Sequence, residues 1–122
     1  MGNALVLGIS QSGKSPDIVA VVAEARRQGA LTAVLTNDTT SELAAEGDVV
    51  IDLHAGKELA VAATKTYTAE LAAIALLSTA LSGDDAQLAE LHTLPAAAAA
   101  TLEMNDAIAT VAPATAIWSA AW

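Results

Sequence analysis

The sequence contains no cysteine and no phenylalanine, and aromatic residues make up only 2% of its 122 positions. The absence of cysteine excludes disulfide bonds and thiolate metal sites. Because hydrophobic residues still make up 54% of the chain, its apolar content is mainly Ala, Val, Leu and Ile. These side chains suit helices that pack closely against a sheet, and their abundance argues against disorder over most of the length. The chain is long enough for one small domain at most.

Positive charge is also scarce, with 5 Lys and Arg residues against 14 Asp and Glu residues and a formal net charge of -9. Proteins that bind nucleic acids gain much of their affinity from Lys and Arg beside phosphates, so we expect no nucleic-acid partner. A small phosphorylated ligand is compatible with this charge. Backbone N–H groups in a loop create positive potential locally, whatever the net charge of the protein.

No segment has the features of a targeting signal or a membrane span. The start, MGNALVLG, lacks the basic region and the long apolar run of a signal peptide. The most apolar long segment, residues 64–81, carries Lys65, Tyr67 and Glu70 near its beginning. We interpret it as a buried helix of a soluble protein rather than a transmembrane helix. We therefore expect a cytoplasmic protein without membrane contact.

Short apolar runs alternate with helical patterns up to about residue 81. This alternation predicts right-handed βαβ crossovers and an α/β fold, a three-layer parallel sheet flanked by helices. Ligands of such sheets bind beyond the carboxyl ends of the strands, where polar segments 10–15, 36–39 and 54–64 fall. The predicted strands are 4–9, 31–36 and 49–53, and the predicted helices are 16–28, 42–46 and 64–81, the first two capped by Ser15 and Ser41.

The pattern weakens after Asp85. Residues 86–91 and 96–104 are predicted helices, while the tail from residue 109 ends without a finished element and carries Trp118 and Trp122, which either pack on the core or form an exposed apolar end. We expect a partial domain at residues 1–83 and a helical extension at residues 84–122. Three strands are few for a doubly covered parallel sheet, so the chain is interpreted as a piece of a larger protein.

The stretch Gly8–Ser15, GISQSGKS, fits G-x-x-x-x-G-K-[ST], the phosphate loop of nucleotide hydrolases. In that hypothesis Lys14 would reach the β- and γ-phosphates, Ser15 would bind a magnesium ion, and Asp52 would be linked to the magnesium. Pro16 argues against it. Lys14 and Ser15 would lie in the start of the helix, and a proline just inside a helix disfavours helical geometry in the residue before it.

A second hypothesis uses the same loop without a metal. Its serine hydroxyls and backbone N–H groups, placed before a helix, can surround a phosphate monoester. Lys14 would then be a solvent-facing charge at the rim, and Ser15 with Pro16 would be the cap and the first residue of the helix. A third possibility is that Ser-Gln-Ser-Gly is only a polar turn between strand and helix.

Residues 5–81 resemble the sugar isomerase (SIS) domain family, which favours the second hypothesis. Two blocks carry the resemblance, SQSG at 10–13 with Ser15, and GKE at 56–58 followed by VAATKTY at 61–67. The resemblance is closest to enzymes with two SIS domains that act on amino-sugar phosphates. These are the isomerase half of glucosamine-fructose-6-phosphate aminotransferase and the SIS-type glucosamine-6-phosphate deaminases.

The resemblance implies a site. Where the aminotransferases usually have Ser, Glu and Gln, this chain has Ala63, Lys14 and Glu70. The SPD after the loop and the VAATK block look more like the deaminases. The implied phosphate ligands are Ser10, Gln11, Ser12 and Ser15, and the residues implied to line the sugar are Val61, Ala63, Thr64 and Lys65.

The resemblance also shows what this chain lacks. SIS domains normally have a strand and a helix before the serine loop, and the two-domain enzymes carry their catalytic Glu and His in a second SIS domain. Nothing after Asp85 resembles that domain. The chain is therefore expected to bind a phosphosugar, glucosamine 6-phosphate or a related sugar, and to be inactive alone within a parent isomerase or deaminase. The alternative is a non-catalytic module that senses a phosphosugar. Family members commonly dimerise, so a homodimer is expected.

Four further residues could have either a functional or a purely structural role. Glu58 and Lys65 lie near the implied site as possible acid and base, and we favour the interpretation that they hold the loop and the helix start. His54 and His92 are far apart in the sequence and have no metal-ligand spacing to each other or to nearby carboxylates. We expect no metal site and no cofactor.

Overall fold

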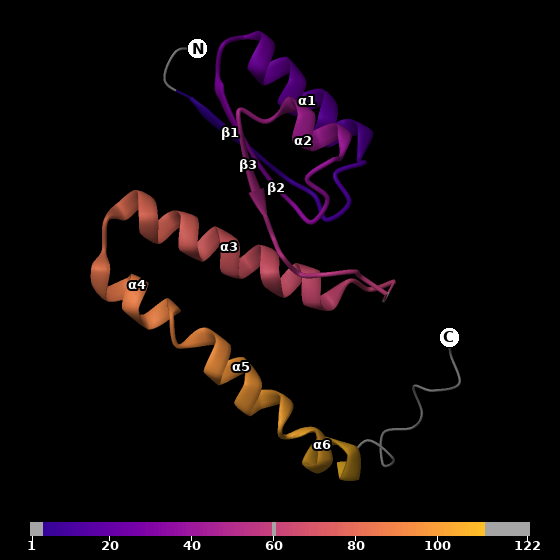
Figure 1. The fold of residues 1–122 in the computed structure, drawn as a ribbon, viewed down its shortest axis with the longest axis vertical. Coiled ribbons are helices and arrows are strands. Elements are labelled where there is room, and N and C mark those ends of the chain that lie inside the picture. The colour runs from indigo at the N-terminus through magenta and orange to yellow at the C-terminus, as the bar shows by residue number, and fades with distance from the viewer. Residues whose placement is uncertain (1–3, 60, 112–122) are drawn as a thin grey trace. The chain divides into compact units, whose positions relative to one another are not determined.

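A computed structural model describes residues 4–59 and 61–111 of the chain (Figure 1). The chain divides into two compact units, Met1–Ser78 and Thr79–Trp122. The predicted domain boundary at residue 83 stays a prediction, because compactness alone does not show that either part folds independently.

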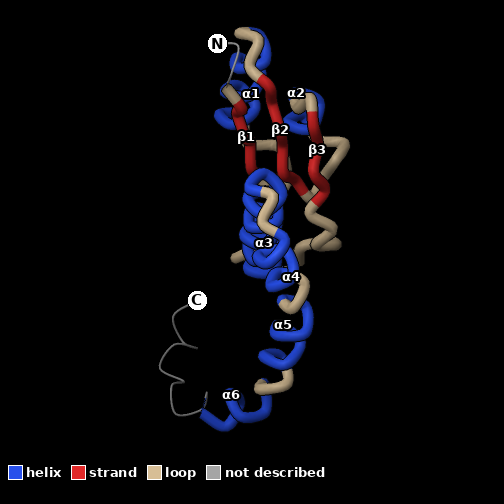
Figure 2. Tube along the Cα trace, turned by 90° about the vertical axis from the view of Figure 1, so that its left-hand side faces the viewer, coloured by secondary structure: helices blue, strands red, loops and turns tan. Residues whose placement is uncertain are grey.

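The first unit contains a parallel sheet with strand order β1-β2-β3. Strand β1 pairs with β2 from Leu5 opposite Leu31, and β2 pairs with β3 from Ala33 opposite Val49. Figure 2 shows the three strands side by side, with helices α1 and α2 packed against one face. The elements up to the end of the long helix are β1 (Leu5–Ile9), α1 (Pro16–Arg27), β2 (Leu31–Thr36), α2 (Glu42–Glu46), β3 (Val49–Asp52) and α3 (Thr64–Ser82).

The core of this unit lies between the sheet and the two helices. Val22 of α1, Val34 of β2 and Leu43 of α2 are almost completely buried together, and Ile18 packs against them. Burying a side chain of this size stabilises the fold by about 1.5–3 kcal/mol. Gly8 of β1 allows α1 to lie close, because a Cβ at this position would stand 2.7 Å from Cγ2 of Val22.

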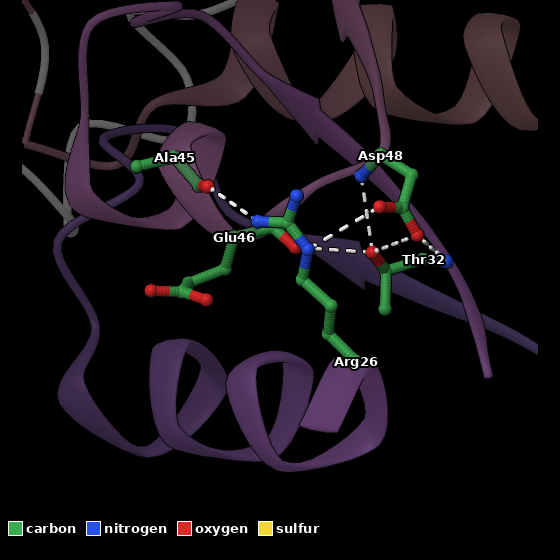
Figure 3. Close-up of polar contacts among 5 residues, drawn as sticks. All are labelled: Arg26, Thr32, Ala45, Glu46 and Asp48. Carbon is green, nitrogen blue, oxygen red and sulfur yellow. Dashed lines mark hydrogen bonds and ion pairs between the residues drawn. The ribbon is translucent and has the colours of Figure 1, made fainter. Parts of the chain in front are cut away.

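A polar network joins the amino-terminal ends of strands β2 and β3 to the ends of α1 and α2 (Figure 3). Asp48 accepts hydrogen bonds from the backbone N–H and the hydroxyl of Thr32, both at 3.0 Å. The Arg26 guanidinium lies 3.2 Å from the same carboxylate and donates to the carbonyl of Ala45 at 3.0 Å. The carbonyl of Glu46 also lies 3.0 Å from the Thr32 hydroxyl oxygen and shares its single proton with Asp48. These contacts fix the starts of β2 and β3 against the end of α1.

The elements agree with most of the sequence predictions. The parallel sheet flanked by helices is confirmed, β2 has the predicted bounds, and Ser41 caps α2 by accepting a hydrogen bond from the N–H of Ala44 at 3.3 Å. In the second unit the predicted helices are present as α4 (Asp85–Leu91) and α5 (Leu94–Leu102). A further helix, α6 (Asn105–Val111), was not predicted. Its Asn, Asp, Ile, Thr and Val residues have low helix propensity.

The expectation that the long apolar helix is buried was wrong. Helix α3 leaves Tyr67, Leu71 and Leu81 at least half exposed. Its apolar residues lie all around the helix, and a neighbouring element can cover only one side. Among the described helices, none is long and apolar enough to cross a membrane. The predictions for the tail from residue 112, including Trp118 and Trp122, lie outside the described residues.

Candidate functional site

The serine loop, residues 10–15, connects β1 to α1 at the carboxyl end of the sheet. Its first residues are anchored to β2 and the turn after it. The N–H of Ser10 donates to the carbonyl of Leu35 at 3.1 Å, and the carbonyl of Gln11 accepts the N–H of Asn37 at 3.0 Å and the hydroxyl of Thr36 at 3.2 Å. The base of the loop is therefore fixed by backbone contacts that do not depend on the serine side chains.

Gly13 allows the loop to lie directly against the start of α2. Its φ of 62° falls in the left-handed region, and a Cβ there would stand 2.0 Å from the Ser41 hydroxyl oxygen. The Gly13 carbonyl accepts the N–H of Leu43 at 3.0 Å. Only glycine fits this position without displacing the cap of α2.

The loop directs donors away from the body of the protein. In a trans peptide the N–H points opposite to the carbonyl before it, and the carbonyls of Gln11 and Gly13 are bonded to the protein. The N–H of Ser12 therefore points outward. Within the described part of the chain, the N–H groups of Ser12, Gly13 and Ser15 have no protein acceptor. Backbone N–H groups that are left without a protein acceptor in a loop before a helix can bind an anion.

Two of the predicted ligands come together across the loop. The hydroxyl oxygens of Ser10 and Ser15 lie 3.5 Å apart, with Ser10 nearly buried. Ser15 occupies the N-cap position of α1 in an extended conformation, as predicted, but its side chain makes no capping hydrogen bond. Ser12 is exposed at the outer side, where its hydroxyl accepts the N–H of Lys14 at 3.4 Å.

The position of Lys14 disfavours the nucleotide hypothesis. Helix α1 begins at Pro16, so Lys14 and Ser15 precede the helix instead of forming its first turn. The Lys14 side chain is exposed. The pKa of the nearby Asp38 carboxyl lies below its usual value, chiefly because the hydroxyl and the N–H of Thr40 donate to it, with a smaller contribution from the Lys14 charge. Lys14 is thus a charge at the rim of the loop, as the second hypothesis expects.

The loop after β3 is tied to the end of β2 by Asn37. The Asn37 carbonyl oxygen accepts the N–H of Ala55 at 3.0 Å, and its amide group donates to the carbonyl of Gly56 at 2.7 Å. Since the backbone N–H of Asn37 also bonds to Gln11, one residue joins this loop to the serine loop. From the sequence, Asn37 is predicted only to lie in a polar turn. Its bonding partner Gly56 is 19 residues away, and no local pattern indicates such a distant contact.

Glu58 and Lys65 make contacts that hold the segment before α3. The Thr66 hydroxyl donates to the Glu58 carboxylate at 2.6 Å, and the Lys65 ammonium donates to the carbonyl of Lys57 at 2.5 Å. Both contacts are those of residues that position the loop and the helix start. On α3, burial raises the pKa of the Glu70 carboxyl.

The residues expected to line the sugar lie around the start of α3. Val61 is fully exposed, Thr64 and Lys65 are exposed on the first turn of the helix, and Ala63 is partly buried with a left-handed φ of 49°. Within residues 4–59 and 61–111, no hydrogen bond joins these four residues to the serine loop, and no three His, Cys, Asp or Glu side chains gather as a metal site would require.

Comparison with known proteins places this geometry in a family. The model of the SIS domain family matches residues 2–80. The chain is 40% identical over 119 residues to glutamine–fructose-6-phosphate aminotransferase (isomerizing) of Zymomonas mobilis, covering 90% of this chain and 20% of the relative. It is 41% identical over 117 residues to the enzyme of the same name from Thermus thermophilus, covering 88% and 19%. The chain thus spans about a fifth of the length of these curated relatives.

A solved structure shows the same likeness. The chain is 51% identical to a protein from Silicibacter pomeroyi assigned as a phosphosugar isomerase, with a TM-score of 0.73. The superposition covers 75% of this chain and 28% of that protein. The family match extends over more than half of the chain, and the chain belongs to the SIS domain family.

Proposed function

We propose that this SIS chain binds the phosphate of an amino-sugar phosphate, with Ser10, Gln11, Ser12 and Ser15 as the phosphate ligands. The observation that supports the proposal most strongly is the number of donors at the serine loop that the protein leaves without an acceptor. Two serine hydroxyls lie 3.5 Å apart beside N–H groups that have no protein acceptor within the described residues. A phosphate monoester offers several acceptor oxygens and would be bound there without a metal ion.

The proposed ligand is glucosamine 6-phosphate or a related sugar, and the proposed parent protein is an isomerase or deaminase of such sugars. The names of the relatives, an isomerizing aminotransferase of fructose 6-phosphate and a phosphosugar isomerase, support this substrate class. The chemistry is proton transfer between adjacent sugar carbons by a positioned base, with loss of ammonia in a deaminase. This chain would supply the phosphate anchor, and Val61, Ala63, Thr64 and Lys65 would line the sugar.

We also propose a domain organisation and an oligomeric state for the chain. Residues 1–83 would form the phosphosugar-binding part and residues 84–122 a helical extension. We further propose a cytoplasmic homodimer that binds no nucleic acid. The family supports self-association, since its members commonly dimerise. The net charge of -9 supports the absence of a nucleic-acid partner.

Isothermal titration calorimetry with the full 122-residue chain tests this function. We expect binding of glucosamine 6-phosphate and of inorganic phosphate, and no binding of unphosphorylated glucosamine, because the serine loop recognises the phosphate. Magnesium-ATP is the competitor for the nucleotide hypothesis. Tight binding of magnesium-ATP that is lost in Lys14→Ala would overturn the proposal, and so would equal affinity for glucosamine with and without its phosphate.

A further inference from the structure

His54 lies just after β3 in an unusual backbone conformation. Its φ of 49° lies in the left-handed region, which residues other than glycine adopt rarely. The side chain is 83% exposed, so burial in the core does not hold the residue there. Strained backbone conformations of this kind are common at ligand sites, where the position of a side chain is maintained despite the cost in backbone energy.

Asp52 fixes both the backbone and the ring of His54. One carboxylate oxygen accepts the His54 N–H at 2.8 Å, and the other lies 3.3 Å from the ring nitrogen Nδ1. A carboxylate at Nδ1 selects the tautomer that carries the proton on that nitrogen. The other nitrogen, Nε2, is then an acceptor, and within the described residues no protein group bonds to it. The chain thus presents an oriented, exposed acceptor.

The ring lines a pocket at the same end of the sheet as the serine loop. The pocket has a volume of about 360 Å³ and is lined by Asn37, Asp52, His54, Gly56 and Lys57. Strand β3 is separated from β1 by β2 alone, so the ends of the two outer strands are about 10 Å apart. Asn37 bonds to the backbone of both loops. The pocket therefore has a fixed position next to the proposed phosphate site.

We propose that His54 is a further ligand-contacting residue, which binds the sugar portion of a phosphosugar whose phosphate lies in the serine loop. Nε2 of His54 accepts a hydrogen bond from a hydroxyl or ammonium group of the sugar, and Asp52 is the positioning residue that orients the ring. Lys57, an exposed residue, lines the same pocket and would be a donor to sugar oxygens. This inference rests on the proposed function, because it requires the phosphate to be held by the serine loop.

Nuclear magnetic resonance of the ¹⁵N-labelled full chain separates the inference from the proposed function. His92, an exposed residue after α4 and outside the pocket, is the internal control. We expect glucosamine 6-phosphate to shift the amide signals of Gln11 to Ser15 and the ring signals of His54, and inorganic phosphate to shift only the loop amides. The ring signals of His92 should respond to neither compound.

Other results of this experiment would overturn the inference, the proposed function, or both. If glucosamine 6-phosphate shifts the loop amides but leaves the His54 ring unchanged, the inference is wrong while the proposed function stands. If the loop amides respond to neither compound, the proposed function fails, and the inference fails with it. Equal ring shifts at His54 and His92 would indicate a nonspecific effect and would also overturn the inference.

A substitution that keeps the backbone provides the second test. Asparagine tolerates the left-handed region, so His54→Asn removes the imidazole with little change in backbone preference. We expect its affinity for glucosamine 6-phosphate to fall roughly tenfold, as for the loss of one hydrogen bond, while its affinity for inorganic phosphate stays unchanged. His92→Asn is the matched control and should bind both compounds normally. Unchanged affinity of His54→Asn for glucosamine 6-phosphate would overturn the inference.

Discussion

The hydroxyl oxygens of Ser10 and Ser15 lie 3.5 Å apart at opposite ends of the serine loop. A serine at an N-cap position usually accepts a hydrogen bond from an N–H of the first helical turn. Ser15 occupies that position for α1, yet its hydroxyl faces Ser10 and leaves those N–H groups to other acceptors. This departure from ordinary capping is what distinguishes the loop from a polar turn, since both the hydroxyls and the N–H groups are available to an anion.

The first prediction compares the two serine caps. Ser41→Ala should lower the free energy of unfolding by about 1 kcal/mol, because the Ser41 hydroxyl caps α2. Ser15→Ala should lower it much less, since the Ser15 side chain makes no capping bond. Urea unfolding followed by circular dichroism measures both variants. A larger loss for Ser15→Ala than for Ser41→Ala would show that Ser15 is a structural cap.

The second prediction concerns the fit of the serine loop against α2. Gly13→Ala should destabilise the protein by about 2 kcal/mol or more, because the left-handed φ is strained and the added methyl group collides with Ser41. Gly29→Ala is the matched control. Gly29 has a φ of 80°, and a Cβ there would meet no atom within 4 Å. Its substitution therefore costs only the backbone strain of the left-handed conformation, about 1 kcal/mol. Equal losses of unfolding free energy in the two variants would contradict the close contact between Gly13 and Ser41.

The third prediction is a loss of stability in acid through Asp48. The pKa of the Asp48 carboxyl is lowered in the folded state, first by the backbone N–H of Thr32, then by its hydroxyl, and less by Arg26. The contribution to stability is therefore complete above the ordinary Asp pKa of about 3.9. As the pH falls below that value toward the lowered pKa, the unfolded chain takes up the proton first, and the contribution is lost.

Asp48→Asn should therefore be less stable than the unmodified chain near neutral pH and should lose less stability on acidification. Urea unfolding at about pH 6 and about pH 3 measures this difference. Glu90→Gln is the control for the loss of one carboxylate, because the Glu90 carboxylate has no partner within the described residues and its removal should cost little stability at about pH 6. The same loss between the two pH values in Asp48→Asn and the unmodified chain would refute the role of Asp48.

The fourth prediction is that the chain alone has no turnover. Glu58 and Lys65, the two residues of the second block considered as acid and base, are engaged in contacts that hold the segment before α3. The family resemblance assigns the catalytic base to a second domain. Assays of ammonia release and of hexose-phosphate isomerisation with glucosamine 6-phosphate should give no signal above buffer. Turnover that Glu58→Gln abolishes would show that this carboxylate is a catalytic base.

Local signals in the sequence were enough to predict most of the elements. An apolar run bounded by turn residues gave strand β2 its bounds, and Ser41 before a short apolar pattern gave the cap of α2. Pro16 marked the start of α1. In each case the determinant lies within a few residues of the element, so periodicity and capping chemistry suffice.

The rest depended on contacts between residues far apart in the sequence. The bonds from Asn37 to Ala55 and Gly56 join segments 18 and 19 residues apart, and no local pattern indicates them. The Ser15 cap was predicted at the right position, but the direction of its hydroxyl follows from the position of Ser10 at the end of β1. The exposure of Leu71 on α3 likewise depends on which elements surround the helix, and its composition does not determine it.

The central claim, that the serine loop holds a sugar phosphate, is tested most directly by removing its hydroxyls. Calorimetric titration of glucosamine 6-phosphate into the Ser10→Ala, Ser12→Ala double variant should show affinity at least about 100-fold weaker, because each hydrogen bond to a charged group contributes about 1.5–3 kcal/mol. Ser78→Ala, on α3, is the control and should bind like the unmodified chain. Affinity in the double variant equal to that of the unmodified chain would contradict the assignment of the site.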